Sequence, residues 1–169
     1  ALYSSMGEAI ERYCANIVPE NLKLASEEEL ALENLPFYEL NKFITYSDEL
    51  LEQEGFPFKK ATRVDKMYWK DSFNYLTGED CYVPASLVYV NFTDHRFNFP
   101  NLSGIASGIN VDKAVQSALM EVIERDASIK WWYFDSKERL IKKEIDGDYT
   151  FLSYQIDAIV PTVATFIYD

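Results

Sequence analysis

The sequence predicts an α+β fold, in which helices and mainly antiparallel strands are mixed. Three observations support this class. Residues 1–17 and 110–134 have the apolar spacing of helices. Residues 63–76 and 81–92 are rich in aromatic and β-branched side chains, and the letters TGED between them are typical of a turn between two antiparallel strands. The regular strand–helix–strand alternation that builds a parallel sheet is missing from the pattern.

The first third of the chain is expected to be mainly helical. A first helix covers about residues 1–17. Ser26 and Glu29 have the spacing of a capping box, which predicts a second helix directly after Ser26. Ser47 is a good N-cap for a short third helix, and Gly55 is a good C-terminal stop for it.

The remainder alternates between loop, helix and strand. After the two strands, residues 94–110 contain glycines and a proline and are expected to form a loop. Asn110 then caps a long helix that reaches about Phe134. The letters GDYT at 147–150 mark a turn before the last strand, and residues 159–169 are expected to be a strand that no later segment covers.

Both ends of the chain suggest a piece of a larger fold. The first helix has no start signal, and the last strand has no neighbour after it. We therefore expect residues 1–169 to be a single partial domain whose N-terminal and C-terminal portions are missing. The alternative is a complete small protein with tight termini.

Composition excludes several classes of partner. Sixteen basic residues against 28 acidic ones give a net charge of −12, and such a field repels nucleic acids and anionic membranes. Neither a membrane-length apolar run nor a signal peptide is visible in the sequence. Cys14 and Cys81 match no metal-ligand spacing, which favours buried thiols in a reducing compartment. The sequence thus predicts a soluble cytoplasmic protein with no nucleic-acid or membrane partner.

A charged pentapeptide occurs twice. Residues 8–12 read EAIER and residues 121–125 read EVIER. Aligned on the first glutamate, both copies follow the pattern S-x-x-x-E-x-I-E-R, with Ser4 matching Ser117; Ser5 adds a second hydroxyl to the first copy. Both copies fall in predicted helices.

Each copy separates its carboxylates from an apolar face. At about 100° per residue, one stripe of the long helix contains polar side chains and a different face contains apolar ones. The polar stripe holds Ser117, Glu121, Glu124 and Ser128, and the apolar face holds Val111, Val115, Ala118 and Val122. In the first helix the two sets are Ser4, Glu8 and Glu11 against Met6, Ile10, Tyr13 and Ile17. Arg12 and Arg125 border the two stripes.

Two interpretations of these stripes are open. Glu and Arg four residues apart often form exposed helix pairs worth only about 0.2–0.5 kcal/mol each. Two copies with the same upstream hydroxyl instead suggest two halves of one site. Four carboxylates brought together repel one another, and divalent cations relieve that repulsion. A ligand set of oxygens without histidine suits Mg²⁺, which usually keeps positions for substrate phosphates, so a nucleotide is the expected ligand.

The glycine-containing loop before the long helix is a second candidate element. Ser107 and Asn110 lie where free backbone N–H groups and the positive end of the helix dipole favour a phosphate. A flexible glycine turn with an ordinary N-cap explains the same residues equally well.

Together these motifs resemble those of the YcaO family. Ser5, Glu8, Glu11 and Arg12 match one nucleotide-binding motif, S-x-x-E-x-x-E-R, and Ser117, Glu121, Glu124 and Arg125 match the other, S-x-x-x-E-x-x-E-R. The stretch SGIASGINVDKAVQSALMEVIERDASIKWW is similar to the family's S-x-G-x-A-x-G turn and following helix, and LTGEDCYVPASLV is similar to the segment upstream.

The resemblance implies an ATP-binding α+β fold without a P-loop, built of mixed helices and a mainly antiparallel sheet. Carried over residue by residue, the metal ligands for Mg²⁺ are Glu8, Glu11, Glu121 and Glu124. The nucleotide-binding residues are Ser5, Arg12, Ser107, Asn110, Ser117 and Arg125. No catalytic residue is assigned.

The activity implied is ATP-dependent activation of a peptide-bond amide, giving an azoline, a thioamide or an amidine. Its best-known form is the cyclodehydratase that modifies ribosomal precursor peptides to thiazolines and oxazolines. Implied partners are a precursor peptide or protein substrate, a peptide-binding partner protein and, among possible assemblies, a homodimer. Family members also contain an earlier phosphate-holding loop and a later Gln/Arg motif, so the 169 residues alone are expected to be inactive.

Two other functional classes stay open at this point. A non-catalytic homologue could keep the fold as a scaffold or peptide-recognition subunit, although the presence of all four glutamates and both arginines argues against it. A small α+β protein whose glutamates are merely exposed helix charges is the third interpretation.

Overall fold

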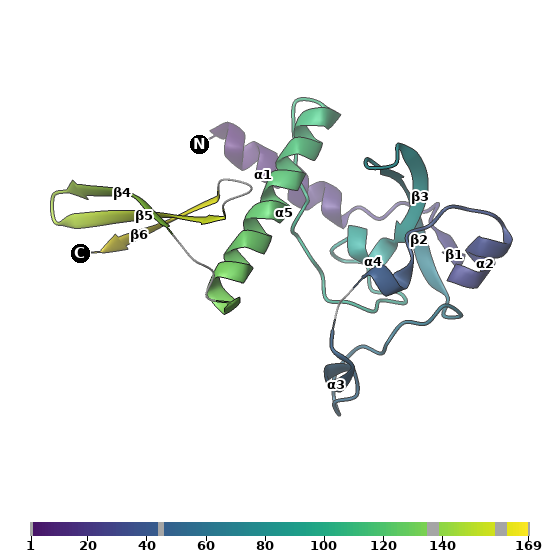
Figure 1. The fold of residues 1–169 in the computed structure, drawn as a ribbon. Coiled ribbons are helices and arrows are strands. Elements are labelled where there is room, and N and C mark those ends of the chain that lie inside the picture. Colours follow the sequence, from purple (N-terminus) through teal and green to yellow (C-terminus); the bar gives the residue numbers. More distant parts are fainter. Residues whose placement is uncertain (1, 44–45, 135–138, 158–161, 169) are drawn as a thin grey trace. The chain divides into compact units, whose positions relative to one another are not determined.

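The computed structural model describes residues 2–43, 46–134, 139–157 and 162–168. The chain forms two compact units, Ala1–Leu102 and Ser103–Asp169, whose elements are labelled in Figure 1.

The first unit combines a small sheet with short helices. Its helices are α1 (Leu2–Asn16), α2 (Glu27–Leu32), α3 (Asp48–Leu51), α4 (Ala85–Val88) and a 3₁₀ turn at Leu40–Lys42. Its strands are β1 (Lys23–Ala25), β2 (Met67–Asn74) and β3 (Glu79–Pro84). They form an antiparallel sheet in the order β1-β2-β3, with Trp69 opposite both Lys23 and Pro84.

Both predicted N-caps of the first unit are confirmed. The Ser26 side chain accepts the Glu29 N–H and the Glu29 carboxylate accepts the Ser26 N–H, so the capping box is complete. Ser47 caps α3 by accepting the N–H of Leu50. Helix α2 begins directly after Ser26, as predicted, and ends at Leu32.

The second predicted strand needs a correction. Residues 81–92 were expected to be extended, but β3 ends at Pro84 and Ala85–Val88 form the short helix α4. Proline has no N–H for a sheet ladder and its fixed φ suits the start of a helix. Packing within the unit also favours the helix over a strand here, since Ala85 and Ser86 are both buried.

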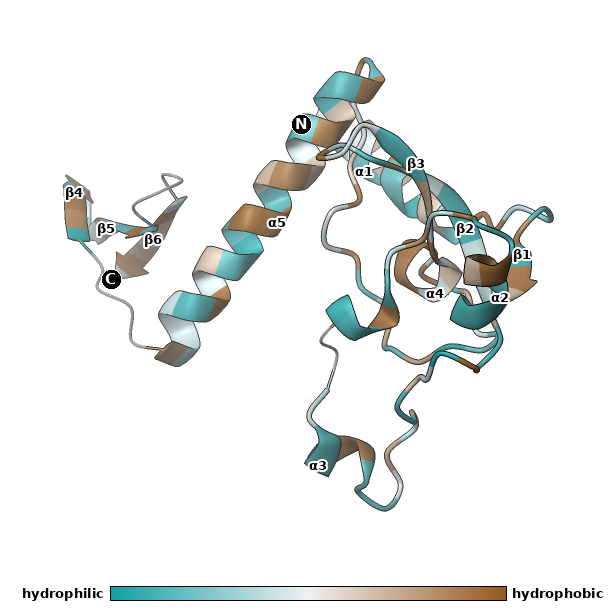
Figure 2. Ribbon diagram, turned by 45° about the vertical axis from the view of Figure 1, so that its right-hand side comes forward, coloured by the Kyte–Doolittle hydropathy of each residue, from teal (hydrophilic) through white to brown (hydrophobic). Residues whose placement is uncertain are grey.

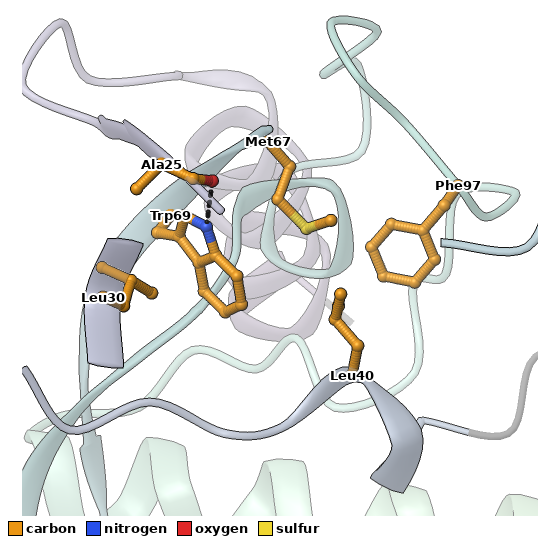
Figure 3. Close-up of a cluster of buried hydrophobic side chains, with 6 residues drawn as sticks. All are labelled: Ala25, Leu30, Leu40, Met67, Trp69 and Phe97. Atoms are coloured by element: carbon orange, nitrogen blue, oxygen red, sulfur yellow. Dashed lines mark hydrogen bonds between the residues drawn. The ribbon is translucent and has the colours of Figure 1, made fainter. Parts of the chain in front are cut away.

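The core of the first unit is a cluster between the sheet and α2. Figure 3 shows its six buried side chains: Ala25, Leu30, Leu40, Met67, Trp69 and Phe97. Trp69 is fully buried, and its indole N–H donates to the Ala25 carbonyl oxygen at 2.9 Å. The largest core side chain is therefore hydrogen-bonded as well as packed.

The second unit consists of one long helix and a three-stranded sheet. Helix α5 spans Val111–Phe134, and the strands are β4 (Arg139–Asp146), β5 (Tyr149–Asp157) and β6 (Thr162–Tyr168). The sheet is antiparallel in the order β4-β5-β6, with Gly147 at positive φ in the first turn. Figure 1 shows this sheet following the green helix along the chain.

One strand of this region was not predicted. The sequence of β4, RLIKKEID, has five charged residues out of eight, and all eight residues are exposed. Residues 162–168 form a strand as predicted, and β6 pairs with β5, which precedes it; residues 159–161 and 169 of that prediction lie outside the described residues.

The α+β class with mainly antiparallel sheets is confirmed. Residues 94–110 contain no helix or strand, as expected for a loop. No helix in the described part of the chain is long and apolar enough to cross a membrane. The expectation of two buried thiols is wrong for Cys14, which is exposed on α1, while Cys81 is half-buried.

Candidate functional site

The first motif lies on α1, in the first unit. Glu8 and Arg12 are one helical turn apart, and the Glu8 Oε1 atom accepts from Arg12 Nη2 at 2.8 Å and from Arg12 Nε at 3.2 Å. The exposed fractions of the two side chains are 62% and 52%. Ser5 is exposed on the same helix, and Glu11 is half-buried. The Glu8 Oε1 atom is thus paired with the arginine, while the side chain stays largely exposed.

The apolar face of α1 is not packed as predicted. Met6, Ile10, Tyr13 and Ile17 are all exposed, and Ala15 is the buried residue of the helix instead. The reason is that α1 is attached at its C-terminal end, where the Val90 N–H donates to the Ala15 carbonyl oxygen at 3.0 Å. Within the first unit, no described element covers the rest of this face.

The second motif lies on α5, in the second unit, directly after the glycine turn. The Asn110 side chain accepts the Lys113 N–H at 2.9 Å, so the predicted N-cap is confirmed. The turn packs closely on the helix start, because a Cβ atom at Gly108 would lie 2.5 Å from the Ala114 nitrogen. Only glycine fits at this position without moving the backbone.

Glu121 joins the glycine turn to the helix. Its Oε2 atom accepts the backbone N–H of Gly104 at 3.2 Å, and its Oε1 atom lies 3.4 Å from Arg125 Nη2. The side chain is 29% exposed. Gly104 has a φ of +87°, which L side chains rarely adopt, and this conformation directs its N–H to the carboxylate. Glu121 is therefore oriented from two directions.

The other predicted residues of this motif lie around Glu121. Ser117, Glu124 and Arg125 are exposed on α5, and Ser107 is half-buried in the turn. The Ser128 hydroxyl donates to the backbone carbonyl oxygen of Glu124 at 2.8 Å, so the side-chain carboxylate of Glu124 takes no part in this hydrogen bond. Hydrophobic residues recur along all of α5 (Figure 2), and Val111 and Val122 of its expected apolar face are exposed.

Within each unit the structure brings one glutamate and its arginine together. In neither unit do three or more described His, Cys, Asp or Glu side chains form a group that could hold a metal. Each motif supplies two glutamates, so a full set of four ligands needs both motifs. Their convergence remains a prediction, because the motifs belong to different units.

The donor chemistry of each half fits Mg²⁺. Glu8 and Glu121 present hard carboxylate oxygens, both side chains are at least 29% exposed, and a neighbouring arginine could contact a phosphate. Glu8, Glu11, Glu121 and Glu124 are the residues that would hold the metal.

Sequence reasoning missed the role of Gly104. Its N–H fixes a carboxylate 17 residues away, and no spacing rule predicts such a contact. The only signal was the glycine itself, placed in a turn before a helix whose exposed stripe carries the glutamate.

Comparisons with known proteins cover nearly the whole chain. Residues 1–167 match the model of the family described as YcaO cyclodehydratase, binding ATP and Mg²⁺. A protein of Rhizobium leguminosarum bv. trifolii, named as an uncharacterized protein in the tfuA 3' region, is 29% identical over 154 residues, which are 86% of this chain and 32% of that protein. An uncharacterized protein of Methanothermobacter thermautotrophicus is 29% identical over 153 residues, or 85% of this chain and 33% of that protein. The chain thus spans about a third of these relatives.

Solved structures share the fold. A heterocyclase in complex with substrate and cofactor has a TM-score of 0.75 at 19% identity, covering 90% of this chain and 24% of that one. The heterocyclase TruD has a TM-score of 0.69 at 17% identity, covering 98% and 30%. YcaO from Methanopyrus kandleri, bound with AMPPCP and Mg²⁺, has a TM-score of 0.59 at 18% identity, covering 91% and 38%.

The fold, the paired motifs and the match over residues 1–167 agree with one another. The expected cofactors agree as well, since the family is one that binds ATP and Mg²⁺. The chain belongs to the YcaO family of ATP- and Mg²⁺-binding cyclodehydratases.

Proposed function

We propose that this chain carries part of an enzyme that uses ATP and Mg²⁺ to activate backbone amides of a peptide or protein. The observation that supports this most directly is the anchoring of Glu121 by Gly104 and Arg125, in a chain that matches the YcaO family over residues 1–167. The product class is an azoline, a thioamide or an amidine, with azoline formation by a cyclodehydratase as the first choice.

The proposed roles are those implied by the two motifs that the chain shares with the YcaO family. Glu121 and Glu8 bind metal through their carboxylate oxygens, and Glu11 and Glu124 complete the set. Arg12 and Arg125 contact phosphate oxygens, with Ser5, Ser107, Asn110 and Ser117 as further nucleotide contacts. When bound, Mg²⁺ and ATP supply the phosphoryl group that accepts the amide oxygen after a nucleophile has attacked the amide carbon.

The proposed partners are a precursor peptide or protein as substrate and a separate peptide-binding protein. We further propose a cytoplasmic location and a single partial domain that is inactive as these 169 residues alone. One relative is named by its position beside tfuA, so the genes adjoining the one for this protein are the first place to seek a partner. A homodimer is a further assembly to test.

The test is peptide-dependent ATP hydrolysis by the complete protein. Glu121→Gln removes one charge and keeps the shape, so hydrolysis should fall at least about a hundredfold, the range typical for losing one transition-state contact. The melting temperature should not change. Glu144→Gln is the control, because Glu144 lies in the same unit in an exposed ion pair with Lys142 at 2.7 Å. Undiminished hydrolysis in Glu121→Gln would refute the proposal.

Calorimetry separates the enzyme from a non-catalytic scaffold. The enzyme should bind ATP only when Mg²⁺ is present, whereas a scaffold should show no Mg²⁺-dependent nucleotide binding.

A further inference from the structure

A pocket of about 460 Å³ lies in the second unit, where the C-terminal half of α5 meets β5 and β6. We call it the tryptophan pocket. The lining residues that matter for the argument are Arg125, Ser128, Ile129, Trp131, Trp132 and Ile156. The predicted metal and nucleotide residues include only one of these, Arg125.

The walls of the tryptophan pocket are apolar and partly uncovered. Ile156 is buried, and Trp131 packs against the ring of Phe166 at 5.4 Å between centroids, so this side is built into the unit. On the open side, Trp132 and Ile129 are 73% and 55% exposed. Large apolar side chains left exposed around a hollow favour an apolar ligand.

Most of the lining surface of the pocket is apolar. Its one charged residue is Arg125, and its hydroxyl-bearing residues are Ser103, Ser128 and Tyr133. The Ser128 hydroxyl already donates to the Glu124 carbonyl oxygen at 2.8 Å. A nucleobase would have several donors and acceptors to satisfy in such a place, and leaving them without partners is costly. An apolar side chain has none, so it suits the pocket better than a base.

Arg125 lines the tryptophan pocket and also lies beside a proposed metal ligand. Its guanidinium lies 3.4 Å from Glu121, the anchored metal ligand of the proposed function. Metal ions in ATP-using enzymes bridge the terminal phosphates, and an arginine beside such a ligand lies near the same phosphates. If Glu121 holds metal and ATP as the proposed function requires, the tryptophan pocket would open beside the terminal phosphates of the nucleotide.

We propose that the tryptophan pocket binds an apolar or aromatic side chain of the substrate, next to the amide that is activated. The inference rests on the proposed function for the identity of its ligand as a peptide. Trp132 and Ile129 would then select the substrate. Peptides with a bulky apolar residue next to the activated amide should be preferred.

The test uses two small probes, N-acetyl-phenylalanine amide and N-acetyl-glycine amide, titrated into the complete protein and followed by ligand-observed NMR. For a ligand of this size a dissociation constant on the order of 1 mM is expected. Trp132→Ala removes the exposed wall, and Trp132→Phe keeps an aromatic ring. Phe134→Ala is the matched control, because Phe134 is 76% exposed on the same helix but does not line the pocket.

We expect the phenylalanine probe to bind about tenfold more tightly than the glycine probe, as one buried aromatic side chain warrants. Trp132→Ala should weaken it at least about fivefold, whereas Trp132→Phe and Phe134→Ala should leave it nearly unchanged. Equal binding of the phenylalanine probe to wild type and Trp132→Ala, or no binding to wild type, would overturn the inference.

A parallel titration with ATP and Mg²⁺ separates this inference from the proposed function. Trp132→Ala should keep the nucleotide affinity that Glu121→Gln loses. If both variants lose it equally, the pocket holds the nucleobase and the inference is wrong. If wild type binds no ATP with Mg²⁺, the proposed function fails, and the two amide probes still report on the pocket.

Discussion

Glu121 and Glu8 each pair with an arginine one turn away, yet these pairs contribute little to stability. Their arginines are 62% and 52% exposed, and exposed helix pairs of this spacing are worth about 0.2–0.5 kcal/mol. A metal ion bound by either carboxylate would therefore displace its arginine at little cost in stability. The guanidinium would then be available to a phosphate.

Gly104 is the residue that most directly fixes a predicted metal ligand. Gly104→Ala places a side chain at a φ of +87° and 3.1 Å from Val122 Cγ2, so the turn should shift away from Glu121. Gly147→Ala is the control in the same unit, with a φ of +59° and open space around it. Each change should cost about 1–2 kcal/mol of stability from backbone strain.

In calorimetry with ATP and Mg²⁺, only Gly104→Ala should weaken binding. Equal nucleotide affinity in both alanine variants would show that the contact between Gly104 and Glu121 does not support the site.

The two cysteines should differ in reactivity. Burial raises the pKa of the Cys81 thiol, with a smaller contribution from the charge of Asp80, whereas Cys14 is exposed. Because the thiolate is the reactive form, a raised pKa leaves less of it at a given pH. Mass-spectrometric mapping after brief iodoacetamide treatment at pH 8 should find Cys14 modified first, and the modification of Cys81 should rise only at higher pH. Faster labelling of Cys81 would contradict this assignment.

Among the elements, the two confirmed N-caps of the first unit have different consequences for the stability of the protein. Ser26 is buried and completes a capping box on α2, beside the core residue Leu30. Ser47 caps α3, a four-residue helix with no buried residue. Ser26→Ala should therefore destabilise the protein by about 1 kcal/mol, the usual cost of losing such a cap, and Ser47→Ala by much less. Urea denaturation measures the free energy of unfolding of both variants. Equal losses of stability would show that α3 contributes more to stability than its exposure indicates.

Prediction from the sequence succeeded where local chemistry decides the structure. Ser26, Ser47 and Asn110 cap helices through their own side chains, and these contacts depend on spacings of three residues. Prediction failed where contacts between residues far apart in the sequence decide the structure. Helix α4 forms where β-branched residues favoured a strand, because Ala85 and Ser86 are buried there, and β4 is a charged strand formed by pairing with β5.

At the scale of the whole molecule, the two halves of the candidate site belong to different units. The repeated pentapeptide predicts both halves, and each copy lies on a helix together with its arginine. Sequence reasoning did not find the contact from Gly104 or the tryptophan pocket, because both arise when the chain folds back over many residues. The proposed function depends on the claim that the two halves converge on one site.

Isothermal titration of the complete protein with ATP, with and without Mg²⁺, tests that claim most directly. Wild type, Glu8→Gln, Glu121→Gln and the double variant are compared. If the motifs form one site, each single change should remove Mg²⁺-dependent binding and the double variant should be no weaker than either, because residues acting as a unit are not additive. Mg²⁺-dependent binding that persists unchanged in Glu8→Gln while it is lost in Glu121→Gln would show that the two motifs do not form one site.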